Sequence, residues 1–344
     1  MKLERKIGAL AVAALLAMVS ASTSAEPGQN GNHKGSGHLA AKRTTIPSTE
    51  GGIVASQVYN NAHFVSNGIA LRNRGGGAFI MSGVTGPVKA AWLYWAVITQ
   101  GAPKAKNKSV TLARFFPTPG SPVTLKGNAV GTGPTPCWLG DTTTVFRAQV
   151  PNSMFSSGGG NGLFALVLKP GASGLTDNSD PFVNSPLPEM EGATLVVVGT
   201  GTGTVALYDQ NLAGQVFASD EGLSYTLLLP ITATNANSVL FSEIGGDGQV
   251  FNGDNNFDPG EANKVTSING NPVAGFTAPD PIPDWDGIAG VPIPQLWDTA
   301  THDVTSAASG TSLAISIDGA QNESNAGDCL LTVANVVEIV PHGH

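Results

Sequence analysis

Residues 91–97 read Ala-Trp-Leu-Tyr-Trp-Ala-Val, an apolar run with three aromatic side chains that is typical of a buried β-strand. Short runs of similar composition recur, separated by clusters of Gly, Pro, Asn and Asp. They occupy residues 88–98, 143–150, 163–169, 193–199, 204–208, 223–229 and 329–340. No capped amphipathic stretch of a dozen residues follows the first 25 residues. The pattern predicts an all-β protein.

The two tryptophans of this run, Trp92 and Trp95, are expected on opposite faces of their strand, because side chains alternate along a strand. One of them therefore faces away from the core of the sandwich. Only 12% of the residues are charged and 41% are hydrophobic, which argues against a disordered chain. The glycines follow no three-residue period, so a collagen-like fold is excluded.

Four sequence elements occur twice in the same order and at similar offsets. The pairs are 91–97 with 238–244, 123–130 with 265–273, 141–144 with 298–301, and 192–197 with 327–332. The second pair carries Gly-Asn or Asn-Gly steps that suit tight hairpin turns. This repetition predicts two related β-sandwich units of the jelly-roll type, 51–200 and 201–344. A single larger sandwich is the alternative.

Several of these segments also resemble a known family. The resemblance is carried by Pro87–Ala96, Phe146–Val150, Glu191–Val198 and the stretch from Trp297 to Thr305. They resemble strands of exported bacterial and archaeal surface domains of unknown function, over most of residues 85–340. The chain departs from the family after Val150, where Ser and Gly are more numerous, and after Val198, which leads into Gly-Thr repeats. The resemblance implies an extracellular β-sandwich without known catalysis and supplies no catalytic residues.

The N-terminus predicts export. Residues 1–25 combine three basic residues with an apolar run at 7–19 and small residues at 23–25, as in a secretory signal peptide. A second cleavage site at 19–21 leaves the mature start at Ser22 or Glu26. Residues 26–50 are polar and glycine-rich and predict a flexible leader. We expect a secreted or cell-surface protein, with the periplasm as the alternative, and no membrane span in the mature chain.

Export also suggests how the two cysteines are used. Cys137 and Cys329 are the only cysteines, and an isolated pair in an oxidising compartment predicts a disulfide bond more readily than a metal site. Two buried free thiols are the alternative.

Charge is distributed unevenly along the chain. Residues 26–169 hold 13 lysines and arginines against three acids, whereas residues 170–344 hold one lysine against 21 acids. Such asymmetry favours head-to-tail association into a homo-oligomer or polymer, or an acidic half that binds cations. Solubility alone is the simpler explanation. The formal net charge of −8 argues against a nucleic-acid partner.

The best candidate site is an acidic loop that suggests calcium as a cofactor. Oxygen-bearing side chains are dense between residues 246 and 261, and calcium takes six to eight oxygen ligands. The candidate ligands are Asp247, Asp254, Asn256, Asp258 and Glu261. An EF-hand is excluded, because Pro259 stands where the turn glycine belongs and Val265 where the closing glutamate belongs. A solvated turn is the alternative.

Other chemistry has weaker support. The sequence contains neither G-x-S-x-G nor H-E-x-x-H, and His302, in an expected strand, is more typical of a structural histidine. Glycoside hydrolysis needs only two carboxylates, which the acidic half can provide, but no pair stands out. Trp285, between Asp284 and Asp286 in a proline-rich loop, is the candidate exposed platform for a polysaccharide.

Together these features predict a non-catalytic, exported structural or adhesive protein of the cell surface or extracellular matrix that self-assembles through its bipolar charge. The first alternative is a secreted, calcium-assisted glycan-binding module. The second is a secreted hydrolase with an unrecognised carboxylate site.

Overall fold

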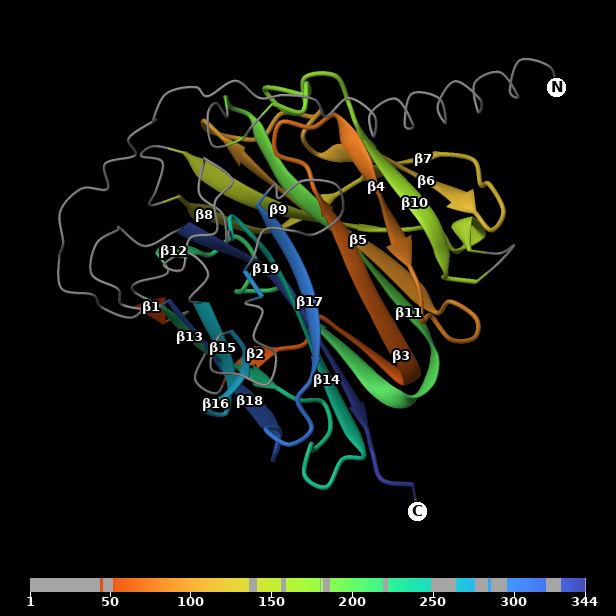
Figure 1. The fold of residues 1–344 in the computed structure, drawn as a ribbon, viewed down its shortest axis with the longest axis vertical. Helices are drawn as coiled ribbons and strands as arrows, with labels where there is room; N and C mark the ends of the chain where they lie inside the picture. The colour runs from red at the N-terminus through yellow and green to blue at the C-terminus, as the bar shows by residue number, and fades with distance from the viewer. Residues whose placement is uncertain are drawn as a thin grey trace. The chain divides into compact units, whose positions relative to one another are not determined.

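The apolar runs form strands in the computed structural model, and the all-β, sandwich-type prediction is confirmed (Figure 1). The structure describes residues 44–45, 52–135, 141–155, 159–179, 181, 186–218, 222–248, 264–275, 284–285, 296–319 and 329–343. Within these ranges the one helical element is a short 3-10 turn, η1 (Asn152–Met154). No helix in the described part of the chain is long and apolar enough to cross a membrane.

A nine-stranded sheet runs through the centre of the fold. Its order is β17 (Trp297–Asp303), β14 (Ser238–Gly246), β19 (Cys329–Val340), β11 (Glu189–Tyr208), β5 (Ala90–Thr99), β9 (Thr142–Gln149) and β8 (Asn128–Pro134), with β3 (Gln57–Ala70) also paired to β11 and β12 (Val216–Ala218) to β19. All of its strand pairs are antiparallel.

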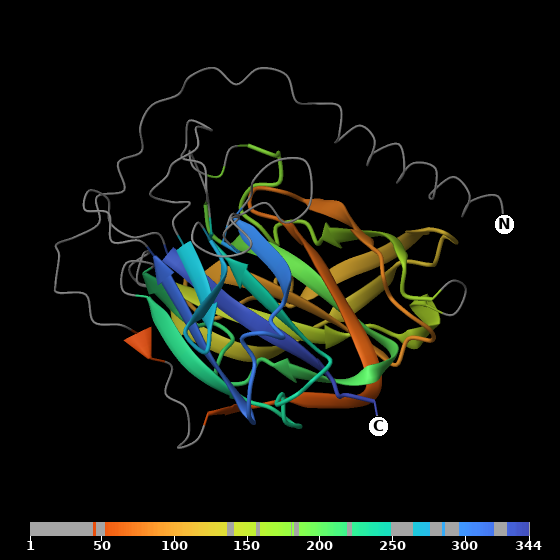
Figure 2. The ribbon, with the colours of Figure 1, turned by 60° about the horizontal axis from the view of Figure 1, so that its bottom comes forward.

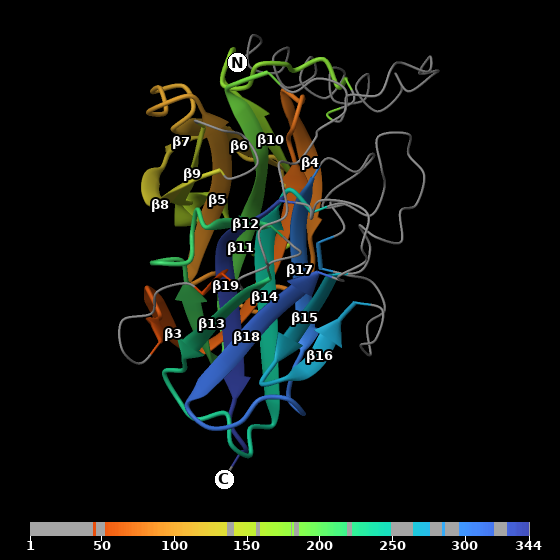
Figure 3. The same ribbon diagram turned by 90° about the vertical axis from the view of Figure 1, so that its left-hand side faces the viewer.

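Two smaller sheets cover different parts of this central sheet. The first has the order β4 (Gly76–Met81), β10 (Gly162–Leu168), β6 (Ser109–Phe116) and β7 (Val123–Lys126). The second has the order β1 (Thr44–Thr45), β13 (Leu223–Leu228), β18 (Ser312–Gly319), β15 (Lys264–Ile268) and β16 (Asn271–Ala274), with β2 (Ile53–Val54) beside β13. In Figure 3 the first small sheet lies at the top of the view and the second at the bottom.

Each small sheet closes a separate hydrophobic core against the central sheet. The first core joins Trp95 and Leu195 of the central sheet to Phe164 of β10. The second core joins Val337 of β19 to Ile315 of β18. A third cluster lines the opposite face of the central sheet and takes residues from both of its halves. Figure 2 shows the second half of the chain, blue to teal, gathered beside the orange and yellow first half.

The predicted units 51–200 and 201–344 share the central sheet. Strand β11 crosses the expected boundary, pairing with β5 through residues 189–198 and with β19 through residues 204–208. The repeated elements nevertheless take equivalent places, because β5 lies between β11 and β9 just as β14 lies between β19 and β17. The boundary at residue 200 thus falls inside one strand. The division into two independent folding units stays a prediction.

Candidate functional site

The candidate site begins where β3 ends. Arg72 follows this strand by two residues, Glu189 and Glu191 lie at the start of β11, and Asp247 comes directly after β14. Their side chains are between 0% and 9% exposed. We call these four residues the Arg72 cluster. Ionisable groups are rarely this buried unless they are paired, so the cluster is either a structural ion pair or a site of function.

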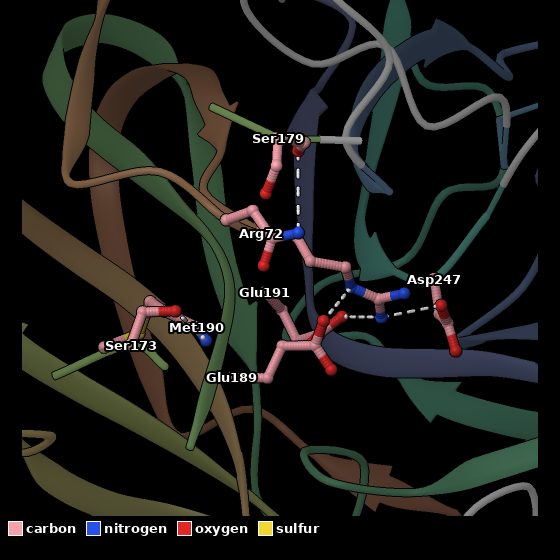
Figure 4. A network of polar contacts seen from close by, with 8 residues as sticks. Arg72, Ser173, Ser179, Glu189, Met190, Glu191 and Asp247 are labelled. Atoms are coloured by element: carbon pink, nitrogen blue, oxygen red, sulfur yellow. Dashed lines mark hydrogen bonds and ion pairs between the residues drawn. The ribbon is translucent and has the colours of Figure 1, made fainter. Parts of the chain in front are cut away.

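The guanidinium of Arg72 contacts all three carboxyl groups, as Figure 4 shows. Its Nη2 donates to Oε2 of Glu191 at 2.5 Å and to Oδ1 of Asp247 at 2.7 Å. Its Nε lies 3.0 Å from Oε1 of Glu189. The contacts span large sequence separations, 119 residues to Glu191 and 175 to Asp247. A single cation therefore faces three acids, two from strand β11 and one from the turn after β14.

Burial and the neighbouring acids favour the protonated form of Glu191. Burial raises the pKa of Glu191 well above its ordinary value, the charges of Glu189 and Asp247 raise it further, and Arg72 offsets this only in part. Burial alone would lower the pKa of Arg72, but the three surrounding acids outweigh it and raise that pKa instead. Oε2 of Glu191 accepts from Arg72, so its proton belongs on Oε1, which has no hydrogen-bond partner in the described structure. The cluster therefore contains a buried carboxyl group whose Oε1 would carry the proton of the acid form.

The turn that carries Asp247 has an uncommon backbone. Asp247 has φ +68°, and Leu296, whose carbonyl accepts from the Asp247 amide at 2.8 Å, has φ +65°. Aspartate adopts this conformation more readily than most residues other than glycine, whereas a bulky residue such as leucine is an outlier there. Such strain persists only where the surroundings impose it, and it is concentrated at functional sites. Of the cluster, Asp247 is also the most exposed member.

A second buried polar group lies between the central sheet and the second small sheet. Glu243 of β14 accepts from Thr266 at 3.1 Å and lies 3.5 Å from the hydroxyl of Tyr225, which donates to Asn335 at 2.8 Å. Nearby, Asp284 Oδ1 lies 2.5 Å from Nε2 of His302. We call Glu243, Asp284 and His302 the Glu243 cluster.

Burial is also the main cause that raises the pKa of Glu243 well above its ordinary value, and the charge of Asp284 adds to it. A carboxyl whose folded-state pKa is raised stabilises the fold while protonated. That stability is fully present below the unfolded pKa of about 4.3 and is lost as the pH rises through the folded value.

Glu243→Gln is therefore expected to melt above the wild type at pH 9, with the difference shrinking towards pH 4, because the amide mimics the protonated acid. Thermal melts of both proteins from pH 4 to pH 9 measure this difference. Asp303→Asn, at an exposed position, serves as the control. A melting difference that does not grow with pH would contradict the expected protonation of Glu243.

The two clusters meet at Gly248. A side chain there would place its Cβ 2.6 Å from Oδ2 of Asp298 and 2.7 Å from the Cα of Trp285. Trp285 directly follows Asp284 of the Glu243 cluster, and Gly248 directly follows Asp247 of the Arg72 cluster. The acids of both clusters thus belong to one polar region at the end of β14.

The sequence-predicted site residues have different outcomes. Of the predicted calcium ligands, Asp247 lies within the described residues, where it forms an ion pair with Arg72. The other four lie outside the described residues: Asp254, Asn256, Asp258 and Glu261. In the described segments no group of three or more His, Cys, Asp or Glu side chains is arranged to hold a metal ion. Calcium binding stays a prediction.

The aromatic platform is a correction. Trp285 is 1% exposed and packs edge-on against Phe217 with ring centroids 6.2 Å apart, in place of the exposed position that its polar neighbours suggested. Its burial is possible because Gly245 leaves room for the ring: a Cβ there would lie 2.1 Å from the indole. Cys329 is buried at the start of β19, and Cys137 lies outside the described residues, so the disulfide stays a prediction.

Sequence analysis did not single out the other members of the two clusters. The available signal was an acid inside an apolar strand: Glu191 precedes a run of buried residues, and Glu243 interrupts the strand 238–244. Arg72 had no such signal, because it stands in a short polar stretch between strands.

Comparison with known proteins gives only distant structural similarities. No protein-family model and no curated protein matches the chain. The chain is similar to PNGase F, a glycosylasparaginase from Flavobacterium meningosepticum, with 12% identity and a TM-score of 0.26, covering 83% of this chain and 97% of that one. It is also similar to BpGH86A, a β-porphyranase from Bacteroides plebeius, with 14% identity and a TM-score of 0.25, covering 76% and 38%. The ANX2 ectodomain from Arabidopsis thaliana matches with 7% identity and a TM-score of 0.24, covering 81% and 83%. Similarities at this level do not transfer an activity.

Proposed function

We propose that this chain is an exported hydrolase that acts on glycans and uses the Arg72 cluster as its acid–base centre. The observation that carries the proposal is the buried Glu191, whose pKa burial raises well above its ordinary value and whose Oε1 has no hydrogen-bond partner in the described structure. Glycoside hydrolysis requires one protonated carboxyl and one carboxylate beside the scissile bond. In this proposal the Arg72 cluster supplies both: Glu191 as the protonated carboxyl and Asp247 as the carboxylate.

In this mechanism Glu191 is the general acid. Its raised pKa keeps a proton at neutral pH, and that proton passes from Oε1 to the oxygen of the leaving group. Asp247 is the partner carboxylate, because it is the most exposed acid of the cluster and its carboxylate is oriented by Arg72 at 2.7 Å. It acts on the sugar carbon either directly or through a water molecule.

Arg72 and Glu189 set the electrostatics of the pair. The guanidinium holds Glu191 and Asp247 through the same Nη2 atom, which fixes the two side chains relative to one another. Glu189, on the Nε side of Arg72, adds a further acid that disfavours ionisation of Glu191. The substrate class follows from this chemistry, since carboxyl pairs without a serine or cysteine nucleophile are typical of glycoside hydrolases.

The test is whether the full exported chain hydrolyses any member of a panel of soluble polysaccharides and N-glycopeptides. Turnover is measured as the release of reducing ends. Asp247→Asn and Glu191→Gln are each expected to lower kcat by about 100-fold or more, as for loss of a general acid or base. Both variants keep the shape of the side chain.

Asp177→Asn is the matched control, because Asp177 is an exposed acid outside the cluster. It should leave the rate unchanged, and circular dichroism should show the same strand content in all variants. A wild-type protein inactive on the whole panel, or an Asp247→Asn variant with the wild-type rate, would contradict the proposal.

The structural or adhesive role and self-assembly through opposite charges stay predictions, as do export and a polysaccharide partner. The hypothesis of a glycan-binding module relied on Trp285 as an exposed platform, and this side chain is buried. The hydrolase proposal is supported by a buried cation in contact with three acids and by the Oε1 atom of Glu191, which has no hydrogen-bond partner in the described structure.

A further inference from the structure

We infer that His302 is a positioning residue for Asp247, acting through Asp284 and Trp285. This inference deepens the proposed function, since it assigns to the same site a further residue, which contacts Asp284. It starts from the turn at Asp247, whose amide donates to Leu296, a bulky residue held at a φ of +65°.

Trp285 packs against both sides of this turn. A Cβ on Gly245 would lie 2.1 Å from Cζ3 of the Trp285 ring, and a Cβ on Gly248 would lie 2.7 Å from the Trp285 Cα. Both glycines are therefore in direct contact with the tryptophan, one before and one after Asp247. The ring itself is fixed by Phe217, which it meets at an interplanar angle of 89°.

Asp284 fastens this tryptophan to the central sheet. Its Oδ1 accepts from Nε2 of His302 at 2.5 Å, and His302 lies on β17, paired with Phe241 of β14. Asp284 is 6% exposed, so the contact is shielded from water and stronger than the same pair on the surface. The other carboxylate oxygen, Oδ2, has no hydrogen-bond partner in the described structure, which leaves His302 as the described side chain that orients Asp284.

His302 thus contacts Asp284, and Asp284 is followed in the chain by Trp285. Trp285 in turn packs against Gly245 and Gly248, which lie on either side of Asp247. Loss of the His302 contact frees the tryptophan, and the turn can then relax from its strained conformation. The carboxylate of Asp247 would leave its place beside Arg72. A histidine that only filled space would leave the turn unchanged.

Hydrogen exchange of the Asp247 amide tests the inference without a substrate, because this amide donates to Leu296 in the native turn. His302→Ala is expected to speed exchange at Asp247 by about 10-fold or more, while amides of the first core, such as Leu195, keep their rates. His302→Gln, whose side-chain amide can donate to Asp284 in place of Nε2, should keep the wild-type rate at Asp247. Asp284→Asn gives an independent variant that removes the carboxylate and keeps its shape.

Unchanged exchange at Asp247 in His302→Ala and Asp284→Asn would overturn the inference. So would an equal increase at Asp247 and at Leu195 in both variants, since that indicates a global loss of stability, or a failure of His302→Gln to restore the wild-type rate. Where turnover is found, His302→Ala should lower kcat with KM unchanged. Selective exchange in a protein without turnover would support the positioning and contradict the hydrolase, so the two can be distinguished.

Discussion

Replacement of Arg72 by methionine is expected to lower the free energy of unfolding by about 3–5 kcal/mol at neutral pH, the usual cost of removing one partner of a buried ion pair. The guanidinium is 4% exposed and is in contact with Glu189, Glu191 and Asp247. Without it, the buried acids lose the cation that they face, and those that are charged must either stay charged at high cost or take up protons. Urea unfolding at several pH values measures the effect.

The pH dependence separates this electrostatic cause from lost packing. Protonation neutralises buried acids, so the loss caused by Arg72→Met should shrink as the pH falls. Arg114→Met is the matched control, because Arg114 is also buried and donates hydrogen bonds to the carbonyls of Phe116, Met154 and Asn161. A loss for Arg72→Met that is the same at every pH would show that packing, and not charge, dominates.

The second large effect is expected at Trp95. Its side chain is fully buried in the first core, stacks on Phe146 with ring centroids 5.6 Å apart, and donates from Nε1 to the carbonyl of Asn107 at 2.9 Å. Trp95→Ala should lower the free energy of unfolding by about 3–5 kcal/mol, since it removes a large ring and leaves a cavity. Gly127 packs directly on this ring, which limits how far the backbone can close the gap.

Trp92→Ala, on the same strand, is the control. Trp92 is only partly buried, lies under the guanidinium of Arg147 at 4.7 Å, and donates to Tyr59 at 2.8 Å. Its removal is expected to cost about 1 kcal/mol, as for a half-exposed residue. Chemical denaturation of both variants measures the difference, and equal losses would mean that both rings contribute the same burial.

Alternation along the strand was sufficient to place these two tryptophans on opposite faces of β5. Trp95 belongs to the first core and Trp92 packs against the cluster on the other face of the central sheet. The fold class and the repeated order of elements could likewise be predicted, because they depend on composition and on a two-residue period that the chain carries locally. The crossing of residue 200 by β11 could not, because it depends on pairing with β5 and β19 at distant positions.

The candidate site shows the same difference between what the sequence predicts and what depends on the tertiary structure. The sequence by itself determined an all-β chain with an acidic second half, and it indicated Asp247 through the density of oxygen-bearing side chains around it. Only the tertiary structure brought Glu191 and Asp247 to Arg72, across 119 and 175 residues of chain, and burial there raises the pKa of Glu191 well above its ordinary value. Charge in a sequence is a local property, whereas the pKa of an acid depends on the water and the charges that the complete fold leaves around it.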